Sequence, residues 1–335
     1  MAAAAAFAGI GISLANEGHL QATHALAQRA DELGFDEVSL PESRQHRSVF
    51  AAAAATLATT SRIRVRIGIA NPVTRHPAVL AMEAATLAEI GGAHRLRFGI
   101  GAAEWTVKAL GYAPEGWKPL THTVETLRAL RRLLAGEELG FTPTTFQAPP
   151  TCRLDFVPAG PITLDVGAVN ARMLRAAGEL ADGVQLGAIT SPGYARWACA
   201  QIAAGANEVL VSANVLTSVG RDRAEARAAV KPVLAYYLWR VEGVVVDHSG
   251  ADPDAVVAVR RAVAEGGAAA GAAVVTDDLV DRFAAAGTVD DVVESYRRFA
   301  HAGVALPLAW YTFGPDVDWA LDALAHEVRP ALLGL

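Results

Sequence analysis

The sequence predicts a (β/α)8 barrel, in which eight parallel strands alternate with helices. Strand-like and helix-like patterns alternate along most of the 335 residues, and eight strands can be counted. Two neighbouring strands, 63–70 and 95–101, break off in Gly, Asn, Pro or charged residues, with a helical pattern at 78–90 between them. Such a unit makes the strands parallel, and ligands bind at the carboxyl ends of parallel strands. We therefore expect a ligand site where these two strands end.

The expected elements follow this alternation from end to end. The strands are expected at 7–14, 36–40, 63–70, 95–101, 162–166, 183–186, 208–219 and 305–311. The helices are expected at 19–33, 49–58, 78–90, 120–134, 171–180, 192–204, 289–301 and 316–333. Gly34 and Gly136 end two of them, because glycine adopts the left-handed conformation found after many helices. The proline-rich stretch 141–156 is expected to be a loop excursion or a hairpin.

The helical pattern after the seventh strand is longer than one crossover needs. Residues 223–287 are expected to be an insertion, with helices at 230–242 and 253–265 that can cover the barrel mouth, all within one domain over 1–335. The alternative is an open, doubly wound sheet, which would usually carry a phosphate fingerprint after its first strand. The only candidate, the Gly-Ile-Gly run at 9–11, lacks the third glycine and lies inside the strand.

Composition excludes several classes of function. Hydrophobic residues make up 52% of the chain, and a net charge of −6 argues against a nucleic-acid surface. No apolar run is long enough to span a membrane, and the alanine-rich start lacks the basic region of a signal peptide. Cys152 and Cys199 are isolated, which gives no metal-ligand spacing and fits a reducing cytoplasm. We expect a cytoplasmic protein with a small-molecule substrate and no metal.

The run from Ile67 to Pro77 is the strongest functional motif. Its strand ends at Asn71-Pro72, and a hydroxyl, a cation and an imidazole precede a helix that starts at Pro77. A helix N-terminus with these groups suits an anion. An ordinary strand end with an Asn-Pro turn is the alternative for the first half. His76 taken alone is more often a capping or packing residue than a catalyst.

Two glutamates are candidates for proton transfer. Glu104 follows Gly99-Ile-Gly101 directly, so a carboxylate stands behind glycines that let a flat ligand come close. The alternative is a helix N-terminal glutamate favoured by the helix dipole. Glu42 follows the second strand in a similar but weaker pattern. Both are expected at the barrel mouth.

Two further loops present glycine and alanine after strands. Gly167, Ala168 and Val169 follow the fifth strand and open a helix, whereas Gly187 and Ala188 follow the sixth. Free backbone N–H groups in such loops suit a phosphate. Ordinary short loops between strand and helix have much the same composition, so the pattern alone is weak.

Taken together, these residues resemble the bacterial luciferase-like monooxygenase family over about 7–330. The resemblance is carried by ADELGFD at 30–36, RIR at 62–64, NPVTRHP at 71–77, FGIG at 98–101, LLAGE at 133–137 and AGELADGV at 177–184. Within the family, the chain is most similar to the F420-dependent branch and its methylenetetrahydromethanopterin reductases. That similarity is carried by ALG at 109–111, WKP at 117–119, GV at 303–304 and GPD at 314–316.

The resemblance implies a barrel with coenzyme F420, a deazaflavin, bound in its mouth. It implies a non-prolyl cis peptide in the third strand, here Gly68–Ile69, that backs the ring, and a phosphate on the backbone of the fifth and sixth loops. Glu104 falls where relatives carry an active-site acid. The cofactor-binding residues it implies are Gly68, Ile69, Ala70, Asn71, Gly101, Gly167, Ala168, Val169, Gly187 and Ala188. It also implies a homodimer, for which the small-residue faces at 51–58 and 78–88 are suited.

Three departures from the family pattern concern the substrate side. Gly11 stands where the reductases have a glutamate in the first strand, and Ala93 ends the usual Gly-Gly-Arg run. Ser43 replaces a common histidine, for which His46 is a candidate substitute. These departures argue that the substrate is not methylenetetrahydromethanopterin.

Three hypotheses of function follow. The first is an F420-dependent oxidoreductase in which a hydride moves between deazaflavin C5 and an electron-poor carbon or a C=N group, with Glu104 as proton donor or acceptor. The second is an FMN-dependent monooxygenase that takes reduced flavin from a partner reductase, since one fold hosts both. The third, motivated by Gly11, is a ligand-binding relative that has lost catalysis.

Overall fold

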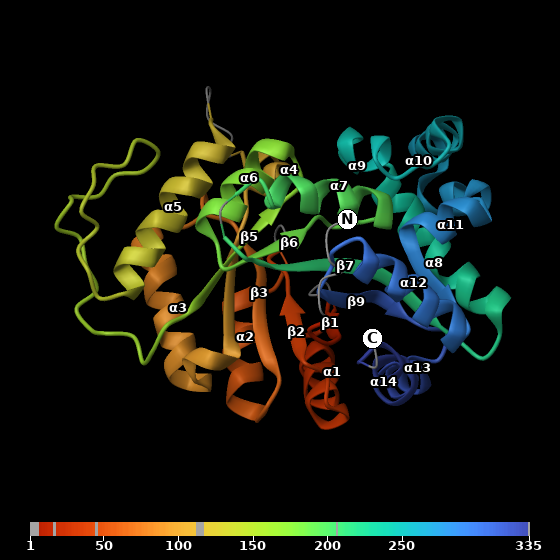
Figure 1. The fold of residues 1–335 in the computed structure, drawn as a ribbon, viewed down its shortest axis with the longest axis horizontal. Helices are drawn as coiled ribbons and strands as arrows, with labels where there is room; N and C mark the ends of the chain where they lie inside the picture. The colour runs from red at the N-terminus through yellow and green to blue at the C-terminus, as the bar shows by residue number, and fades with distance from the viewer. Residues whose placement is uncertain (1–6, 16–17, 44–45, 112–116, 206, 334–335) are drawn as a thin grey trace.

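The described chain forms a closed barrel of parallel strands surrounded by helices (Figure 1). The computed structural model describes residues 7–15, 18–43, 46–111, 117–205 and 207–333. The ring consists of β1 (Gly11–Ser13), β2 (Glu37–Leu40), β3 (Arg64–Ala70), β4 (Leu96–Ile100), β5 (Thr163–Ala168), β6 (Gly183–Leu186), β7 (Leu210–Val219) and β9 (Leu306–Phe313). Neighbours pair in the order β6-β5-β4-β3-β2-β1-β9-β7, and β6 pairs with β7 to close the ring. The predicted eight-stranded barrel is confirmed.

Helices connect the strands on the outside of the ring. Between β1 and β7 they are α1 (Leu20–Leu33), α2 (Val49–Thr59), α3 (Pro77–Gly91), η1 (Ala93–Arg95), α4 (Glu104–Ala109), α5 (Pro119–Leu134), α6 (Ala171–Leu180) and α7 (Pro192–Ile202). After β7 they are α8 (Arg223–Leu238), α9 (Gly243–Asp247), α10 (Pro253–Val274), α11 (Asp277–Phe283), α12 (Val289–His301), α13 (Val317–Ala323), η2 (Leu324–Val328) and α14 (Arg329–Leu333).

Local capping signals fix several helix ends. Gly34 ends α1 with φ 81°, the left-handed conformation that its lack of a side chain permits. Thr288 and Asp291 form a capping box at the start of α12, each side chain satisfying a backbone N–H of the other residue. These signals are readable in the sequence, and the helices predicted outside the segment 223–287 begin and end within a few residues of the observed ones up to α12.

The segment between β7 and β9 differs from its prediction in three ways, and one of them is that its helix at 253–265 continues to Val274 as α10. Its first helix begins at Arg223 rather than at 230, because Asp222 Oδ1 accepts the N–H of Glu225 at 2.9 Å and caps it. Its end is a ninth strand, β8 (Ala284–Gly287), which pairs with the second half of β7. Alanine and glycine have low strand propensity, so this run carries no local strand signal, and it forms a strand by pairing with the ten-residue β7.

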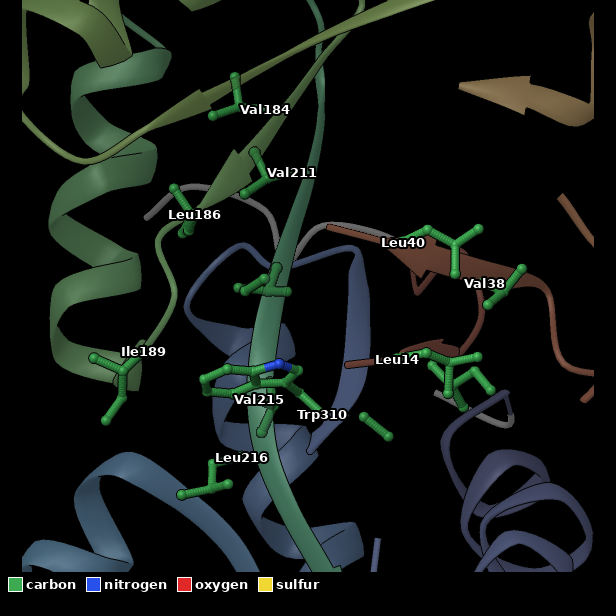
Figure 2. Packing of buried hydrophobic residues seen from close by; sticks show 14 of the residues in the cluster. Leu14, Val38, Leu40, Val184, Leu186, Ile189, Val211, Val215, Leu216 and Trp310 are labelled. Carbon is green, nitrogen blue, oxygen red and sulfur yellow. The ribbon is translucent and has the colours of Figure 1, made fainter. Parts of the chain in front are cut away.

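Strand residues alternate between an apolar outer face and a polar interior. Val38 and Leu40 pack in the apolar layer between strands and helices, together with residues of β6 and β7 (Figure 2). Glu37 and Ser39, the alternate residues of the same strand, are fully buried on the other face. The barrel interior is therefore polar, although the chain as a whole is hydrophobic.

A buried ionic cluster fills the lower part of the interior. The guanidinium of Arg66 contacts the carboxylates of Glu37 and Asp165, and the three side chains have no exposed surface. Arg97 adds hydrogen bonds to the two oxygens of Asp165 at 2.6 and 2.9 Å. Two cations and two anions balance, which is the condition for keeping charges away from water.

One expected strand boundary shifts, and one pair of alternatives is decided by the structure. β5 continues to Ala168, so Gly167 and Ala168 lie in the strand and not in the loop after it. The stretch 141–156 has no helix or strand, so it is the loop excursion of the two predicted alternatives. Leu139 N bonds Cys152 O at 2.8 Å and ties the two sides of this loop together.

Candidate active site at the carboxyl ends of the strands

Unusual backbone geometry gathers at the carboxyl ends of the barrel strands. The peptide bond Gly68–Ile69 at the end of β3 is cis, as the resemblance implied. Among the described residues, three that are not glycine have positive φ, and they are Ala103, Tyr311 and Phe313. Ala103 follows β4, and the other two lie at the end of β9. Positive φ at residues other than glycine is common at functional sites, so this face of the barrel is the candidate site.

The side chain of Ile69 lies over glycines from the neighbouring strands. A methyl group on Gly101 would lie 2.7 Å from Ile69 Cδ1, and one on Gly167 would lie 3.1 Å from Ile69 Cγ2. A Cβ on Gly99 would lie 3.0 Å from Ile69 Cγ2 and 2.5 Å from the backbone oxygen of Ile67. Side chains at these three positions would displace Ile69. The glycines thus create a small apolar platform that is partly exposed at the mouth.

Polar atoms without partners converge beside this platform. The Cβ that Gly68 lacks would contact Ser39 Oγ and would lie 2.6 Å from Gln185 Oε1. Both oxygens are buried and have no hydrogen-bond partner. Buried polar groups are normally paired, so these two are available to the polar edge of a ligand or to water. The backbone at Gly68 is therefore in close contact with two unpaired polar oxygens, and a side chain at this position would clash with them.

Glu42 ties the loop after β2 to the loop after β3. Its Oε2 accepts the backbone N–H of Asn71 at 2.8 Å, and its Oε1 contacts the guanidinium of Arg75. Asn71 Nδ2 in turn donates to Ala102 O at 2.9 Å, which joins the loop after β4. Glu42 and Arg75 also line a cavity of about 250 Å³. Glu42 therefore holds three loops of the mouth in one arrangement.

The histidines near the mouth have structural contacts. His76 Nδ1 caps α3 by accepting the N–H of Ala78 at 3.2 Å, so the capping interpretation is confirmed. Its Nε2 lies 2.8 Å from Gln147 O and attaches the 141–156 loop. His122 on α5, which the sequence analysis did not single out, lies 3.2 Å from Pro72 O. Burial lowers the pKa of His122, although the Pro72 carbonyl and Glu125 oppose this, so its neutral form is favoured.

The two other acid–base candidates are exposed. Glu104 is the first residue of α4, as the helix-terminal alternative proposed, and its carboxylate pairs with Lys108 at 2.7 Å. Its side chain is 57% exposed, and it does not line the cavity that contains Glu42. His46 is exposed on the loop after β2. The structure thus brings Glu42 to the mouth cavity and leaves Glu104 and His46 at its rim.

The two predicted phosphate loops lie against each other. A Cβ on Gly187 would lie 3.5 Å from Val169 Cγ2. Tyr194 Oη donates to Val169 O at 2.8 Å and fixes that loop from below. Asn170, the residue before α6, makes no side-chain cap. The first amides of this ten-residue helix are therefore left for other acceptors, next to the exposed Ala188.

An aromatic cluster on the other side of the mouth escaped the sequence analysis. Trp310 and Tyr311 at the end of β9 meet Tyr237 of α8, with ring centroids 4.7 and 6.3 Å from the Tyr237 ring. Tyr237 and Trp310 are 73 positions apart in the chain, so no local motif marks their contact. Only the closure of the barrel brings them together.

Two searches of the described residues gave negative results. No group of three or more His, Cys, Asp or Glu side chains is placed to hold a metal ion. None of the helices in the described part combines the length and apolarity needed to cross a bilayer.

Comparison with known proteins identifies the family of the chain. Residues 4–306 match the family model described as luciferase-like monooxygenase. The 5,10-methylenetetrahydromethanopterin reductase of Methanolobus tindarius is 32% identical over 312 residues, which cover 90% of this chain and 94% of that protein. The corresponding enzyme of Archaeoglobus fulgidus is 31% identical over 315 residues, covering 90% of this chain and 93% of that protein.

Solved structures show the same fold. The coenzyme F420-dependent tetrahydromethanopterin reductase of Methanopyrus kandleri superposes with a TM-score of 0.88 at 25% identity, covering 98% of this chain and 100% of that one. An F420-dependent secondary alcohol dehydrogenase, solved with an F420–acetone adduct, gives a TM-score of 0.78 at 20% identity and covers 97% and 99%. At that identity the second likeness concerns the fold alone.

Proposed function

The chain belongs to the luciferase-like monooxygenase family, and we propose that within it the protein is a coenzyme F420-dependent oxidoreductase acting on a small molecule. The relatives that match it over nine-tenths of its length are reductases whose structural counterpart uses F420. The hydride acceptor or donor is an electron-poor carbon or a C=N group. The observation that carries the proposal is the Ile69 platform, with glycines of β4 and β5 around it and polar atoms at its edge.

The residues present fit such a cofactor. A flat ring needs a flat apolar support without protruding side chains, which Ile69 over Gly99, Gly101 and Gly167 supplies. Its polar edge needs hydrogen-bond partners, and Ser39 Oγ and Gln185 Oε1 are unpaired there. Ala70 and Asn71 continue the platform toward the loop that Glu42 holds.

These contacts indicate which roles belong to the cofactor and which to the protein. Coenzyme F420, when bound, supplies two-electron hydride chemistry. The protein binds and orients its ring at Ile69 and fixes the loops around it through Glu42, so that reacting atoms are held in a productive geometry. Amides of Val169 and of the start of α6, with Gly187 and Ala188 beside them, hold the cofactor phosphate.

Glu104 holds or moves the proton in this proposal. Its pair with Lys108 is an exposed i,i+4 contact, which is worth little and is easily exchanged for another partner. Glu42, by contrast, is committed to Asn71 and Arg75. A carboxylate that already accepts these hydrogen bonds is a poor proton acceptor, so Glu42 is assigned to positioning the loops. His46 remains the second candidate for the proton.

The substrate differs from that of the reductases in this proposal. A Cβ at Gly11 would lie 2.5 Å from Leu308 Cδ2 and 3.2 Å from Glu37 Cβ. A glutamate side chain at position 11 would therefore require its neighbours to move. The interior near β1 is occupied by the ionic cluster of Glu37 instead, which supports an acceptor other than methylenetetrahydromethanopterin.

The protein is proposed to act as a homodimer in the cytoplasm. Val79, Met82 and Ile90 are exposed apolar side chains on α3, one of the small-residue helices expected at the interface. Both cysteines are free, which suits a reducing compartment. Met82→Lys should shift the protein toward monomer in sedimentation velocity, whereas Val257→Lys on the exposed face of α10 should not.

Titration of the apoprotein with F420 and, separately, with FMN tests the cofactor assignment. F420 is expected to bind at least tenfold more tightly, measured by fluorescence of the bound cofactor. Tighter binding of FMN would instead support the flavin-dependent monooxygenase hypothesis. Failure of both cofactors to bind would support a relative without catalysis.

A further inference from the structure

The aromatic cluster at the mouth joins the barrel to the segment after β7. The rings of Trp310 and Tyr311 lie 5.4 Å apart at 82°, and Tyr237 meets Trp310 at 4.7 Å and 69°. These edge-to-face contacts are a favoured arrangement for aromatic rings. Trp310 is almost fully buried, whereas Tyr311 is 37% exposed. The cluster therefore runs from the barrel interior to its open surface.

The backbone that presents these rings is strained. Tyr311 has φ 75° and Phe313 has φ 58°, a region that side chains other than glycine rarely adopt. The pairing of β7 with β9 shifts register at the same place, between Leu216 and Ser218. Strain and bulges of this kind persist at ligand sites, where they aim side chains. A cluster that only anchored α8 would need neither.

The cluster stands on the side of the mouth away from the Ile69 platform. β9 is separated from β3 by β1 and β2 in the ring, and Trp310 is in register with Leu216 of β7. Figure 2 shows the Trp310 ring next to β7, where Leu216 is its register partner. The strands form a closed ring, so the carboxyl ends of β3 and β9 border the same opening. A cofactor ring on Ile69 therefore has its second face toward this cluster.

We propose that the substrate is a flat, conjugated ring compound, bound between the cofactor ring and the aromatic cluster of Tyr237, Trp310 and Tyr311. This inference rests on the proposed function, because it uses the cofactor position at Ile69. The three side chains of the cluster are uncharged aromatic rings. Aromatic rings bind a planar π-system more strongly than a saturated ring of the same size, so the cluster favours a flat substrate. The hydride donor and acceptor then lie face to face, as the transfer requires.

The test compares two uncharged probes with one carbon skeleton, 2-naphthol and decahydro-2-naphthol. Binding of each is measured by calorimetry on the apoprotein and on the F420-loaded protein. The flat probe is expected to bind about tenfold more tightly, since each aromatic contact adds a few-fold to the affinity. Tyr311→Gly should remove most of this preference without unfolding the protein, because glycine accepts the positive φ. Tyr237→Leu is the second variant.

Trp239→Leu is the matched control. Trp239 lies just after α8 and is 41% exposed. The guanidinium of Arg240 lies 4.8 Å from the centre of its ring, and Trp239 is not part of the aromatic cluster. The preference should be unchanged in this variant. Equal binding of the two probes by wild type, or an undiminished preference in both Tyr311→Gly and Tyr237→Leu, would overturn the proposal. Titration of the same samples with F420 tests the proposed function. Probe binding to the apoprotein tests the aromatic cluster, because it does not require the cofactor.

Discussion

The backbone N–H of Asn71 donates a 2.8 Å hydrogen bond to the carboxylate of Glu42. Glu42 follows β2, and Asn71 follows β3, so this bond joins two loops that the sequence separates by 29 positions. Arg75 completes the arrangement from the start of α3. Because the Glu42 carboxylate is bound to both Asn71 and Arg75, it stabilises the loops of the mouth. The two glutamates at the strand ends are therefore expected to respond differently to the same substitution.

Glu104→Gln should lower turnover by about 10² to 10⁴ while leaving F420 affinity nearly unchanged, because glutamine keeps the size but cannot exchange a carboxyl proton. Steady-state kinetics with a reactive acceptor, together with F420 titration, measure the two effects. Glu42→Gln is the control and should lower turnover less, with a lower melting temperature from the weakened loop contacts. Full turnover in Glu104→Gln would move the proton role to Glu42 or His46.

Gly167→Val should weaken F420 binding at least tenfold, or about 1.4 kcal/mol. Even the first carbon of the new side chain would lie 3.1 Å from Ile69 Cγ2, so the platform would shift, and the phosphate amides next to it would shift as well. Fluorescence titration with F420 measures the loss. Gly160→Ala is the control, since its Cβ would meet only Ala93 Cβ at 3.4 Å. Unchanged affinity in Gly167→Val would place the phosphate elsewhere.

The sequence allowed the barrel to be predicted because its signals are local. Alternation of apolar and polar residues along β2, with Val38 and Leu40 outside and Glu37 inside, is readable in one strand. The Ala-Ala-Ala-Gly run of β8 has no such signal and becomes a strand only through β7. Helices and strands with a strong local pattern could therefore be predicted. A strand that forms only because it pairs with a distant strand could not.

The site was predictable only in part, for the same reason. The glycines were found through local motifs, and the Gly68–Ile69 cis peptide was implied by the family resemblance. The contact of Tyr237 with Trp310 depends on barrel closure and has no local signature. The sequence also could not reveal that Glu42 accepts hydrogen bonds from another loop, which changes its role.

Stability in acid should depend on Asp31 at the end of α1. Burial tends to raise the pKa of this carboxyl, but backbone N–H groups of Ser61, Ile63 and Arg62 outweigh it and lower the pKa below its usual 3.8. A depressed folded-state pKa adds stability above the unfolded pKa and loses it as the pH falls below about 4. Asp31→Asn should therefore lower the melting temperature at pH 7 and have little further effect at pH 3.

Thermal melts of wild type and Asp31→Asn between pH 3 and pH 7 measure this difference. Glu32→Gln is the matched control, since its neighbouring carboxylate is 68% exposed and pairs only with Arg29 at 3.5 Å. If the difference in melting temperature between Asp31→Asn and wild type is the same at every pH in this range, the charge of Asp31 contributes nothing to stability.

Removing Arg66 should be the most damaging single change in the barrel interior. Burial alone would lower the pKa of its guanidinium, but Glu37 and Asp165 raise it, so the cation is present throughout the ordinary pH range. Arg66→Met leaves Glu37 buried without its main partner, and breaking a buried pair from one side costs about 3–5 kcal/mol. Urea unfolding followed by far-ultraviolet circular dichroism measures the loss.

Two further variants separate this effect from a general sensitivity of β3. Arg64→Met removes a cation 3.7 Å from the same Glu37, but that side chain is 38% exposed, so the loss should stay below about 1 kcal/mol. Replacing Arg66 by Met and Glu37 by Leu together removes both charges of the pair, while Asp165 keeps its two hydrogen bonds from Arg97. The double variant should be more stable than Arg66→Met alone, because the penalty comes from the orphaned carboxylate and not from the lost contact. A double variant less stable than the single one would show that the pair contributes net stability to the barrel.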